Sequence, residues 1–99
     1  IRNPELAESL IHSFNLNDFK SKKIYKLSDG TKKKVSILIL FLINPDFFIL
    51  DEPYTYLDPE AINVLNNLII NSTDKGKSFF ITDNSSGLKD IEFFESVKL

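Results

Sequence analysis

The sequence predicts an α/β fold in which buried parallel strands are covered by helices, and three observations support this fold class. Residues 47–50, Phe-Phe-Ile-Leu, form an apolar run without alternation, which is typical of a strand buried on both faces. Residues 78–82, Ser-Phe-Phe-Ile-Thr, form a second such run. A segment with helical periodicity, residues 59–71, separates them, and a crossover of this kind places two strands in parallel.

The length and composition describe one small domain. The chain has 99 residues, of which 42% are hydrophobic, and its nine phenylalanines can fill a core. A net charge of −2 argues against a dedicated nucleic-acid binder, and the lack of cysteine fits a reducing compartment. The most apolar segment, residues 35–43, is shorter than the ~20 residues of a membrane-spanning helix, so a buried core helix is expected there.

We expect the sequence to be a fragment of a longer chain. It contains no methionine and starts at Ile1, and no secretory signal is visible there. Its three glycines are Gly30, Gly76 and Gly87, and none of them begins a phosphate-binding loop of the type G-x-x-x-x-G-K-S/T.

The first predicted element is a helix that starts at Asn3. Asn is a good capping residue, and Pro4 and Glu5 suit the first turn of a helix. Apolar residues then recur at helical spacing as far as Phe14. His12, the only histidine, lies beside this stripe, and we expect a surface or boundary residue because no partner motif surrounds it.

A polar segment rich in lysine follows, and the lysines continue as far as residue 34. These lysines have two interpretations, a patch that binds anions or nucleic acid and a solvated face. The slightly negative net charge favours the solvated face.

A second helix is predicted from about residue 29 or 31 to residue 42, with Ser28 as its cap. The amino end of a helix carries free N–H groups and the positive end of the helix dipole, so it suits a phosphate. An ordinary Ser-capped helix is the alternative interpretation. The helix is expected to break at residues 44–46, Asn-Pro-Asp, before the first strand.

Two carboxylates end that strand. Asp51 and Glu52 follow the apolar run directly, and Pro53 cannot continue the hydrogen-bond ladder. Open α/β sheets bind their ligands at the carboxyl ends of the strands. A polar turn after a core strand is the alternative. Further on, Asp58 is predicted to cap the helix that begins at Pro59.

Taken in order and at these spacings, three motifs resemble the C-terminal half of the nucleotide-binding domain of ATP-binding cassette (ABC) ATPases, which have a P-loop NTPase fold. Residues 27–31, Leu-Ser-Asp-Gly-Thr, resemble the signature motif, residues 47–52 the Walker B strand, and residues 55–58 the D-loop. The resemblance covers essentially the whole chain. It implies that residues 1–44 are part of a helical subdomain and that residues 45–99 are the C-terminal part of the catalytic core.

The resemblance implies that the amino end of the second helix binds nucleotide across a subunit interface. In this family it faces the γ-phosphate of ATP bound to a partner subunit, so Ser28, Asp29 and Gly30 are the expected binding residues. Asp29 stands where the family usually has Gly, and Thr31 where it usually has Gln. A carboxylate repels a phosphate, and a side chain restricts the backbone more than Gly does, so both departures weaken the expected contact.

The resemblance also assigns roles to four other residues, with ATP and Mg²⁺ as cofactors. Asp51 is expected to orient Mg²⁺ through water, and Glu52 to act as general base or to position the attacking water, since phosphoryl transfer needs charge neutralisation and a placed nucleophile. Asp58 is expected at the interface between two subunits. Asn84 falls where the family has a switch histidine, and its amide lacks the reach and charge of an imidazole.

The implied function is that of the ATP-binding subunit of a transporter, which couples MgATP hydrolysis to transport. The implied partners are a second ABC subunit in a head-to-tail dimer and a membrane-embedded permease, at the cytoplasmic face of the membrane. One alternative is a regulatory or structural cassette with little hydrolysis, which Asp29, Thr31 and Asn84 favour and Glu52 opposes. Another is a cassette that acts on nucleic acid, which only the lysines favour. The substrate is not readable from these residues.

Two expectations concern the chain by itself. Without a phosphate-binding loop it should not hydrolyse ATP alone. With an exposed half-sheet it should be poorly soluble or oligomeric.

Overall fold

A computed structural model describes residues 3–17 and 27–83 of the chain. The elements follow the predicted order, and the helix predicted over residues 59–71 extends three residues further. Their bounds are α1 Pro4–Ser13, α2 Asp29–Ile43, β1 Phe47–Asp51, α3 Pro59–Asp74 and β2 Ser78–Thr82. Asn84 lies outside the described residues. So do residues 87–94, where the sequence also predicts a short helix, and residues 96–99, where it predicts the start of a last strand.

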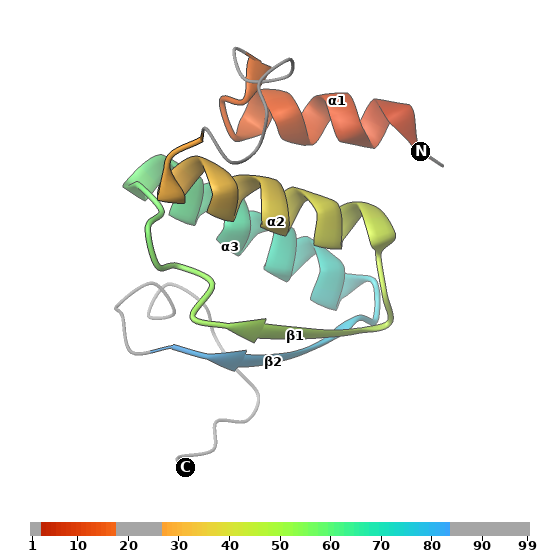
Figure 1. Ribbon diagram of the computed structural model, residues 1–99. Coiled ribbons are helices and arrows are strands. Elements are labelled where there is room, and N and C mark those ends of the chain that lie inside the picture. Colours follow the sequence, from red (N-terminus) through yellow and green to blue (C-terminus); the bar gives the residue numbers. More distant parts are fainter. Residues whose placement is uncertain (1–2, 18–26, 84–99) are drawn as a thin grey trace.

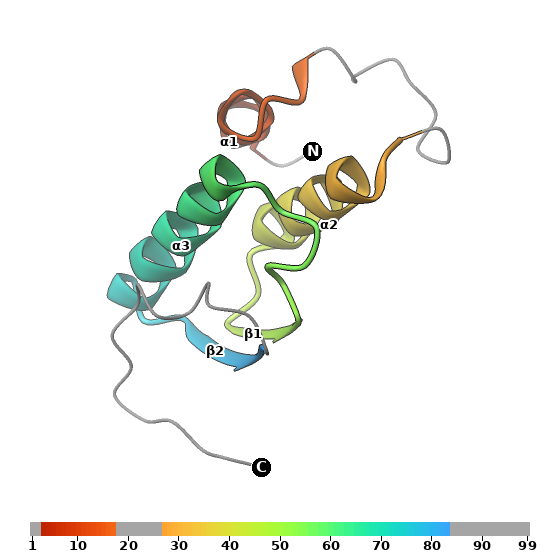
Figure 2. The same ribbon diagram turned by 90° about the vertical axis from the view of Figure 1, so that its left-hand side faces the viewer.

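The elements form layers, which Figures 1 and 2 show from two sides. Strands β1 and β2 make a parallel sheet, α2 and α3 lie side by side over one of its faces, and α1 lies on the other side of the helix pair. Both α2 and α3 run opposite to the strands. The amino ends of these helices and the carboxyl ends of the strands therefore lie at the same end of the molecule.

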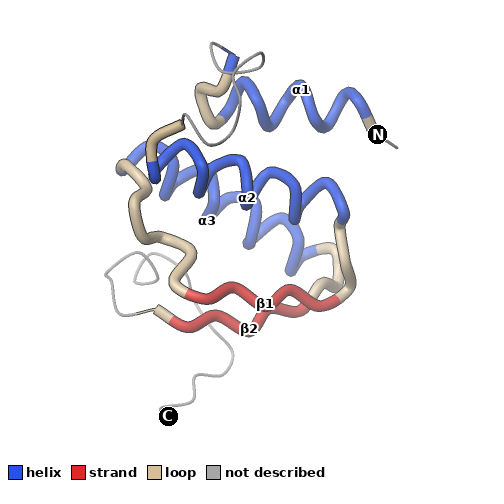
Figure 3. The backbone as a smooth tube through the Cα atoms, viewed as in Figure 1, coloured by secondary structure: helices blue, strands red, loops and turns tan. Residues whose placement is uncertain are grey.

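The predicted parallel pairing is confirmed, with Phe47 opposite Ser78 and Asp51 opposite Thr82. Figure 3 shows the two strands side by side. Burial on both faces of β1, however, is a wrong prediction for the described residues. Phe48 is fully buried against the helices, whereas Ile49 on the other face is 71% exposed. The reason is that the described helices cover only one face of the sheet.

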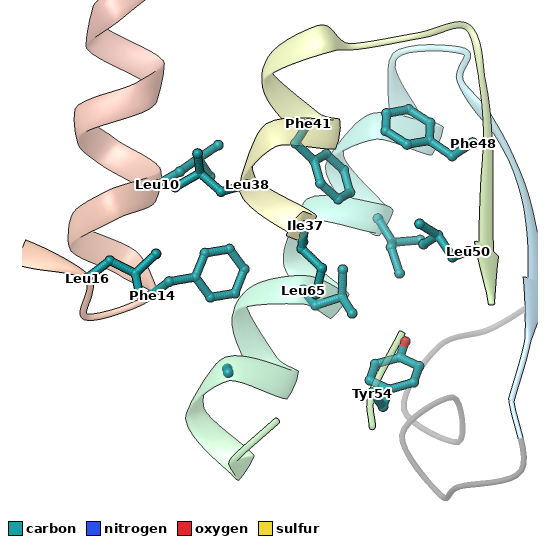
Figure 4. Packing of buried hydrophobic residues seen from close by; sticks show 12 residues of the cluster. Leu10, Phe14, Leu16, Ile37, Leu38, Phe41, Phe48, Leu50, Tyr54 and Leu65 are labelled. Carbon is teal, nitrogen blue, oxygen red and sulfur yellow. The ribbon is translucent and has the colours of Figure 1, made fainter. Parts of the chain in front are cut away.

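The core lies between the helices and the covered face of the sheet (Figure 4). Its centre is an aromatic group from three elements. The ring centroids of Phe41 and Phe48 are 4.9 Å apart, and Phe48 stacks on Phe79 at 4.5 Å. Leu65 of α3 is also fully buried there. Leu10 of α1, and Phe14 directly after this helix, close the core on the far side.

All three predicted helix caps are confirmed. In each case a side-chain oxygen accepts a hydrogen bond from a backbone N–H that has no partner inside the helix. The donor–acceptor distances are 3.0 Å from Leu6 N to Asn3 Oδ1, 3.1 Å from Thr31 N to Ser28 Oγ, and 2.8 Å from Ala61 N to Asp58 Oδ1. The helix α2 ends at Ile43, and the next residue, Asn44, has a left-handed φ of 54°, as is common after a helix.

The predicted surface position of His12 is confirmed, whereas Lys33 and Lys34, which the sequence predicts on a solvated face, are only partly exposed. His12 is exposed on α1. Across residues 3–17 and 27–83, none of the helices combines the length and the apolar character that crossing a membrane requires.

Candidate functional site

The candidate site lies at the end of the molecule where the strands finish and α2 and α3 begin (Figure 1). Three segments meet the solvent there. They are the first turn of α2 with its cap, the carboxyl end of β1, and the loop over residues 52–58, which leads from β1 to α3. The fold thus brings to one end the residues that the sequence singled out at 28–30, 51–52 and 58.

Asp51 is the last residue of β1, and its carboxylate is held by the neighbouring strand. Thr82 is its register partner, and the Thr82 hydroxyl donates a hydrogen bond of 2.5 Å to Asp51 Oδ1. Carboxylate and hydroxyl oxygens are ligands that suit Mg²⁺, which is usually held by one or two carboxylates, by waters and by substrate phosphates. The described residues include no cluster of three or more acidic, His or Cys side chains that could hold a metal.

Glu52 follows in an unusual backbone conformation. Its φ of 48° is left-handed, and its backbone N–H still donates to the Thr82 carbonyl at 2.8 Å. This conformation costs a non-glycine residue on the order of 1–3 kcal/mol and persists only where the surroundings impose it. Here it turns the chain away from the strand direction directly after Asp51. The half-buried Glu52 therefore starts the 52–58 loop rather than prolonging the strand.

The 52–58 loop is anchored to α3 by a buried tyrosine. Tyr54 is 3% exposed, and its hydroxyl donates a hydrogen bond to the side-chain carbonyl of Asn66, which is buried in α3. The Leu57 N–H donates back to the Tyr54 carbonyl at 3.1 Å. Tyr56 has a second left-handed conformation, with a φ of 70°. The loop thus has a defined path, although it carries no regular secondary structure.

The Ser28 hydroxyl is engaged within its own helix. It accepts from the Thr31 N–H and donates to Thr31 Oγ1 at 2.9 Å, and Thr31 itself is buried. The capping role predicted for Ser28 is therefore confirmed. The donors that this helix end offers to an anion are its first-turn backbone N–H groups, including that of Gly30, because such groups have no acceptor within the helix. Asp29 is exposed at the same end.

Gly30 also has a packing role that the sequence did not reveal. A Cβ atom at this position would lie 2.9 Å from the Tyr56 carbonyl oxygen, closer than real side chains come. The first turn of α2 therefore touches the backbone of the 52–58 loop. Only glycine permits this approach without a shift of one segment.

A second contact joins the same two segments. Lys34 Nζ lies 3.5 Å from Asp58 Oδ2, with 15% of the lysine side chain exposed and 57% of the aspartate. The pKa of Asp58 is held below its ordinary value, first by the hydrogen bond from the Ala61 N–H; desolvation opposes this, and the charge of Lys34 adds to it. Sequence reasoning missed this pair because residues 34 and 58 are joined only by the fold.

A groove formed by the described residues lies elsewhere. It has a volume of about 420 Å³ and is lined by residues of α1 and by the carboxyl-terminal halves of α2 and α3, including Phe41 and Ser72. This groove is therefore separate from the candidate site, which lies at the amino ends of α2 and α3.

Comparison with known proteins identifies the family. A model of the family described as "ABC transporter" matches residues 2–55. A protein of Pyrococcus furiosus, provisionally named an ABC transporter ATP-binding protein, is 35% identical over 84 residues, which are 85% of this chain and 32% of that protein. The cytochrome c biogenesis ATP-binding export protein of Rickettsia typhi is 34% identical over 84 residues, 85% of this chain and 43% of that protein.

A solved structure agrees with these relatives. It is titled "Structure of ATP binding subunit of ABC transporter" and superposes with a TM-score of 0.75 at 29% identity, over 86% of this chain and 38% of the other. The chain thus spans roughly a third to two fifths of the length of these proteins. Since the family model covers more than half of the chain and the fold agrees, the chain belongs to the ABC transporter family of ATP-binding proteins.

Proposed function

We propose that the chain is part of the ATP-binding subunit of an ABC transporter, and that the intact protein couples MgATP binding and hydrolysis to transport of a substrate. The observation that carries the proposal is the pair Asp51 and Glu52 at the carboxyl end of β1. The pair lies at the same end of the fold as the amino end of α2. Membership of the family and the export function named for the Rickettsia relative support the proposal.

The roles of the two acids follow from their positions. Asp51, which accepts a hydrogen bond from the Thr82 hydroxyl, would hold Mg²⁺ through water. When bound, the cation would neutralise negative charge on the phosphates. Glu52, held in a left-handed turn one residue further, would accept a proton from the attacking water.

The remaining roles require a second subunit. The first-turn N–H groups of α2, with Ser28, Asp29 and Gly30, would face the γ-phosphate of ATP held by a partner subunit, and Asp58 would lie at the interface. Asn84 would take the switch position. In this scheme residues 1–44 belong to the helical subdomain and residues 45–99 to the catalytic core. The dimer would work with a membrane-embedded permease, at the cytoplasmic face of the membrane.

A regulatory or structural cassette with little hydrolysis is the second candidate function. Two observations at the amino end of α2 favour it. Asp29 exposes a carboxylate where an anion would bind, and Thr31 is buried and bonded to Ser28 instead of reaching outward. Under this proposal nucleotide binding remains, whereas turnover is low.

The test uses the protein expressed from its own reading frame. If the reading frame upstream of Ile1 encodes a phosphate-binding loop of the type G-x-x-x-x-G-K-S/T, the protein should show Mg²⁺-dependent ATPase activity. Glu52→Gln should lower kcat by about a hundredfold or more and leave nucleotide binding intact, because a general base contributes about 10²–10⁴-fold to rate.

The matched control is Glu5→Gln, a neutralised acid in the first turn of α1. It should keep wild-type turnover. If the wild-type protein binds ATP but does not hydrolyse it, Glu52→Gln has no activity to remove. This result would favour the regulatory cassette. A protein that does not bind ATP at all would contradict both proposals.

A further inference from the structure

Lys34 stands between two segments that the proposed mechanism needs in a fixed arrangement. It lies in the second turn of α2, and its ammonium group reaches Asp58 at 3.5 Å. The side chain of Lys34 is largely buried, although its charge meets a half-exposed carboxylate. A lysine whose stem is packed in this way has less rotamer freedom to lose when the ion pair forms.

The ion pair acts beside a direct contact of the same two segments. The close approach of Gly30 to the Tyr56 carbonyl joins the first turn of α2 to the 52–58 loop. The pair between Lys34 and Asp58 joins the second turn of α2 to the end of that loop. Two contacts, one between backbones and one between charges, thus join α2 to the loop at two places.

The loop needs such support because it contains two left-handed residues, Glu52 at 48° and Tyr56 at 70°. Conformations of this kind persist only when their surroundings determine them. At its start the loop is bonded to β2 through the Glu52 N–H and the Thr82 carbonyl. At its other end Asp58 both caps α3 and accepts the Lys34 ion pair.

We propose that Lys34 is a positioning residue for ATP hydrolysis. Its ion pair with Asp58 fixes the 52–58 loop against α2, and thereby holds Glu52 and the amino end of α2 in the arrangement that turnover requires. This inference rests on the proposed function, since it concerns the same site. It adds a residue that lies outside the signature motif and contacts neither nucleotide nor metal in the proposed scheme.

If Lys34 acted only by stabilising the fold, Lys34→Met would lower kcat in proportion to the loss of folded protein. A partly exposed ion pair contributes little to stability, so Lys34→Met, which keeps an apolar stem and removes the charge, should leave folding nearly unchanged. If the pair positions the loop, the same variant should lower kcat without a matching loss of folded protein.

The experiment measures kcat and KM for MgATP in the protein expressed from its own reading frame. Lys34→Met should lower kcat about fivefold and change KM less than about twofold, because a partly exposed ion pair holds the loop only this strongly and misplaced catalytic groups slow the chemical step more than binding. Lys34→Arg should restore most of the rate. Lys32→Met, an exposed lysine of the same helix, is the matched control and should behave as wild type.

A double-mutant cycle tests the partner. Asp58→Asn keeps a capping oxygen for α3 and removes the charge that Lys34 needs. Because Asp58 is also proposed to lie at the subunit interface, it should lower kcat at least as much as Lys34→Met does, and the double variant should be no slower than Asp58→Asn. Effects that multiply in the double variant would show that the two residues act separately and would overturn the proposal.

Failure of this inference can be told apart from failure of the proposed function. If the wild-type protein shows no ATPase turnover, or a turnover that Glu52→Gln does not abolish, the proposed function is wrong, and the role of Lys34 is wrong with it. An active wild type in which Lys34→Met keeps its kcat overturns the role of Lys34 alone. A kcat loss that matches the loss of folded protein by circular dichroism also overturns it.

Discussion

At the scale of single residues, Gly30 and Ser28 show how one motif can serve both folding and function. Ser28 caps α2 through Thr31, so its hydroxyl is already bonded within the helix. Gly30 permits the Tyr56 carbonyl to approach the helix, and its N–H belongs to the first turn. The motif is therefore required for the local fold whether or not nucleotide is bound.

Gly30→Ala should destabilise the chain by about 1–3 kcal/mol, because the new methyl group forces α2 and the loop apart. Urea unfolding followed by circular dichroism measures this change. Ser36→Ala, at an exposed position of the same helix, is the control and should be neutral or slightly stabilising, since Ala is the better helix former. If Gly30→Ala were as stable as the wild type, the 52–58 loop would have to shift away from the new methyl group at no cost, which would contradict the packing role of Gly30.

At the scale of elements, the aromatic contact among α2, β1 and β2 holds the helix layer on the sheet. Phe48 lies between Phe41 and Phe79, with ring centroids 4.9 and 4.5 Å away. Its neighbour Phe47 points to the other face and is 56% exposed. Adjacent residues of one type thus differ in burial, because successive side chains of a strand point to opposite faces.

This pair of neighbours gives a matched experiment. Phe48→Ala should destabilise the chain by about 3–5 kcal/mol, as expected when a fully buried ring is replaced by a cavity. Phe47→Ala should cost less than about 1 kcal/mol, because most of that ring already meets solvent. Thermal or urea unfolding of both variants measures the difference. Similar losses would indicate that both faces of β1 are covered in solution.

At the scale of the whole molecule, the layers leave one face of the sheet without a covering helix among the described elements. Its exposed large side chains are Phe47, Ile49 and Phe80, which are 56%, 71% and 47% exposed. Asp51 and Thr82 belong to the same face by their register. The candidate site therefore borders an apolar surface that water does not solvate well.

The isolated 99-residue chain should associate with itself through this surface, in a concentration-dependent manner visible by sedimentation velocity. Ile49→Lys should shift the chain toward monomer, because it adds a charge to the middle of the face. Ile70→Lys, at an exposed position on α3, is the control and should leave the association unchanged. A wild-type chain that stays monomeric at high concentration would contradict this expectation.

Much of the fold could be predicted from local signals. Asn3, Ser28 and Asp58 marked three helix starts, because capping depends on a residue and its immediate neighbours. The parallel pairing of the strands followed from the crossover between them. The family could also be recognised from the sequence, since its motifs are short, ordered and regularly spaced.

The sequence by itself thus determined the order of elements, their caps and the pair of acids at the end of β1. Tertiary structure alone decided which face of β1 is buried, because an apolar run without alternation does not indicate which of its side chains face the core. It also decided that Gly30 touches Tyr56 and that Lys34 reaches Asp58. These contacts join residues 24 or more positions apart, and only the packing of α2 against the 52–58 loop brings them together.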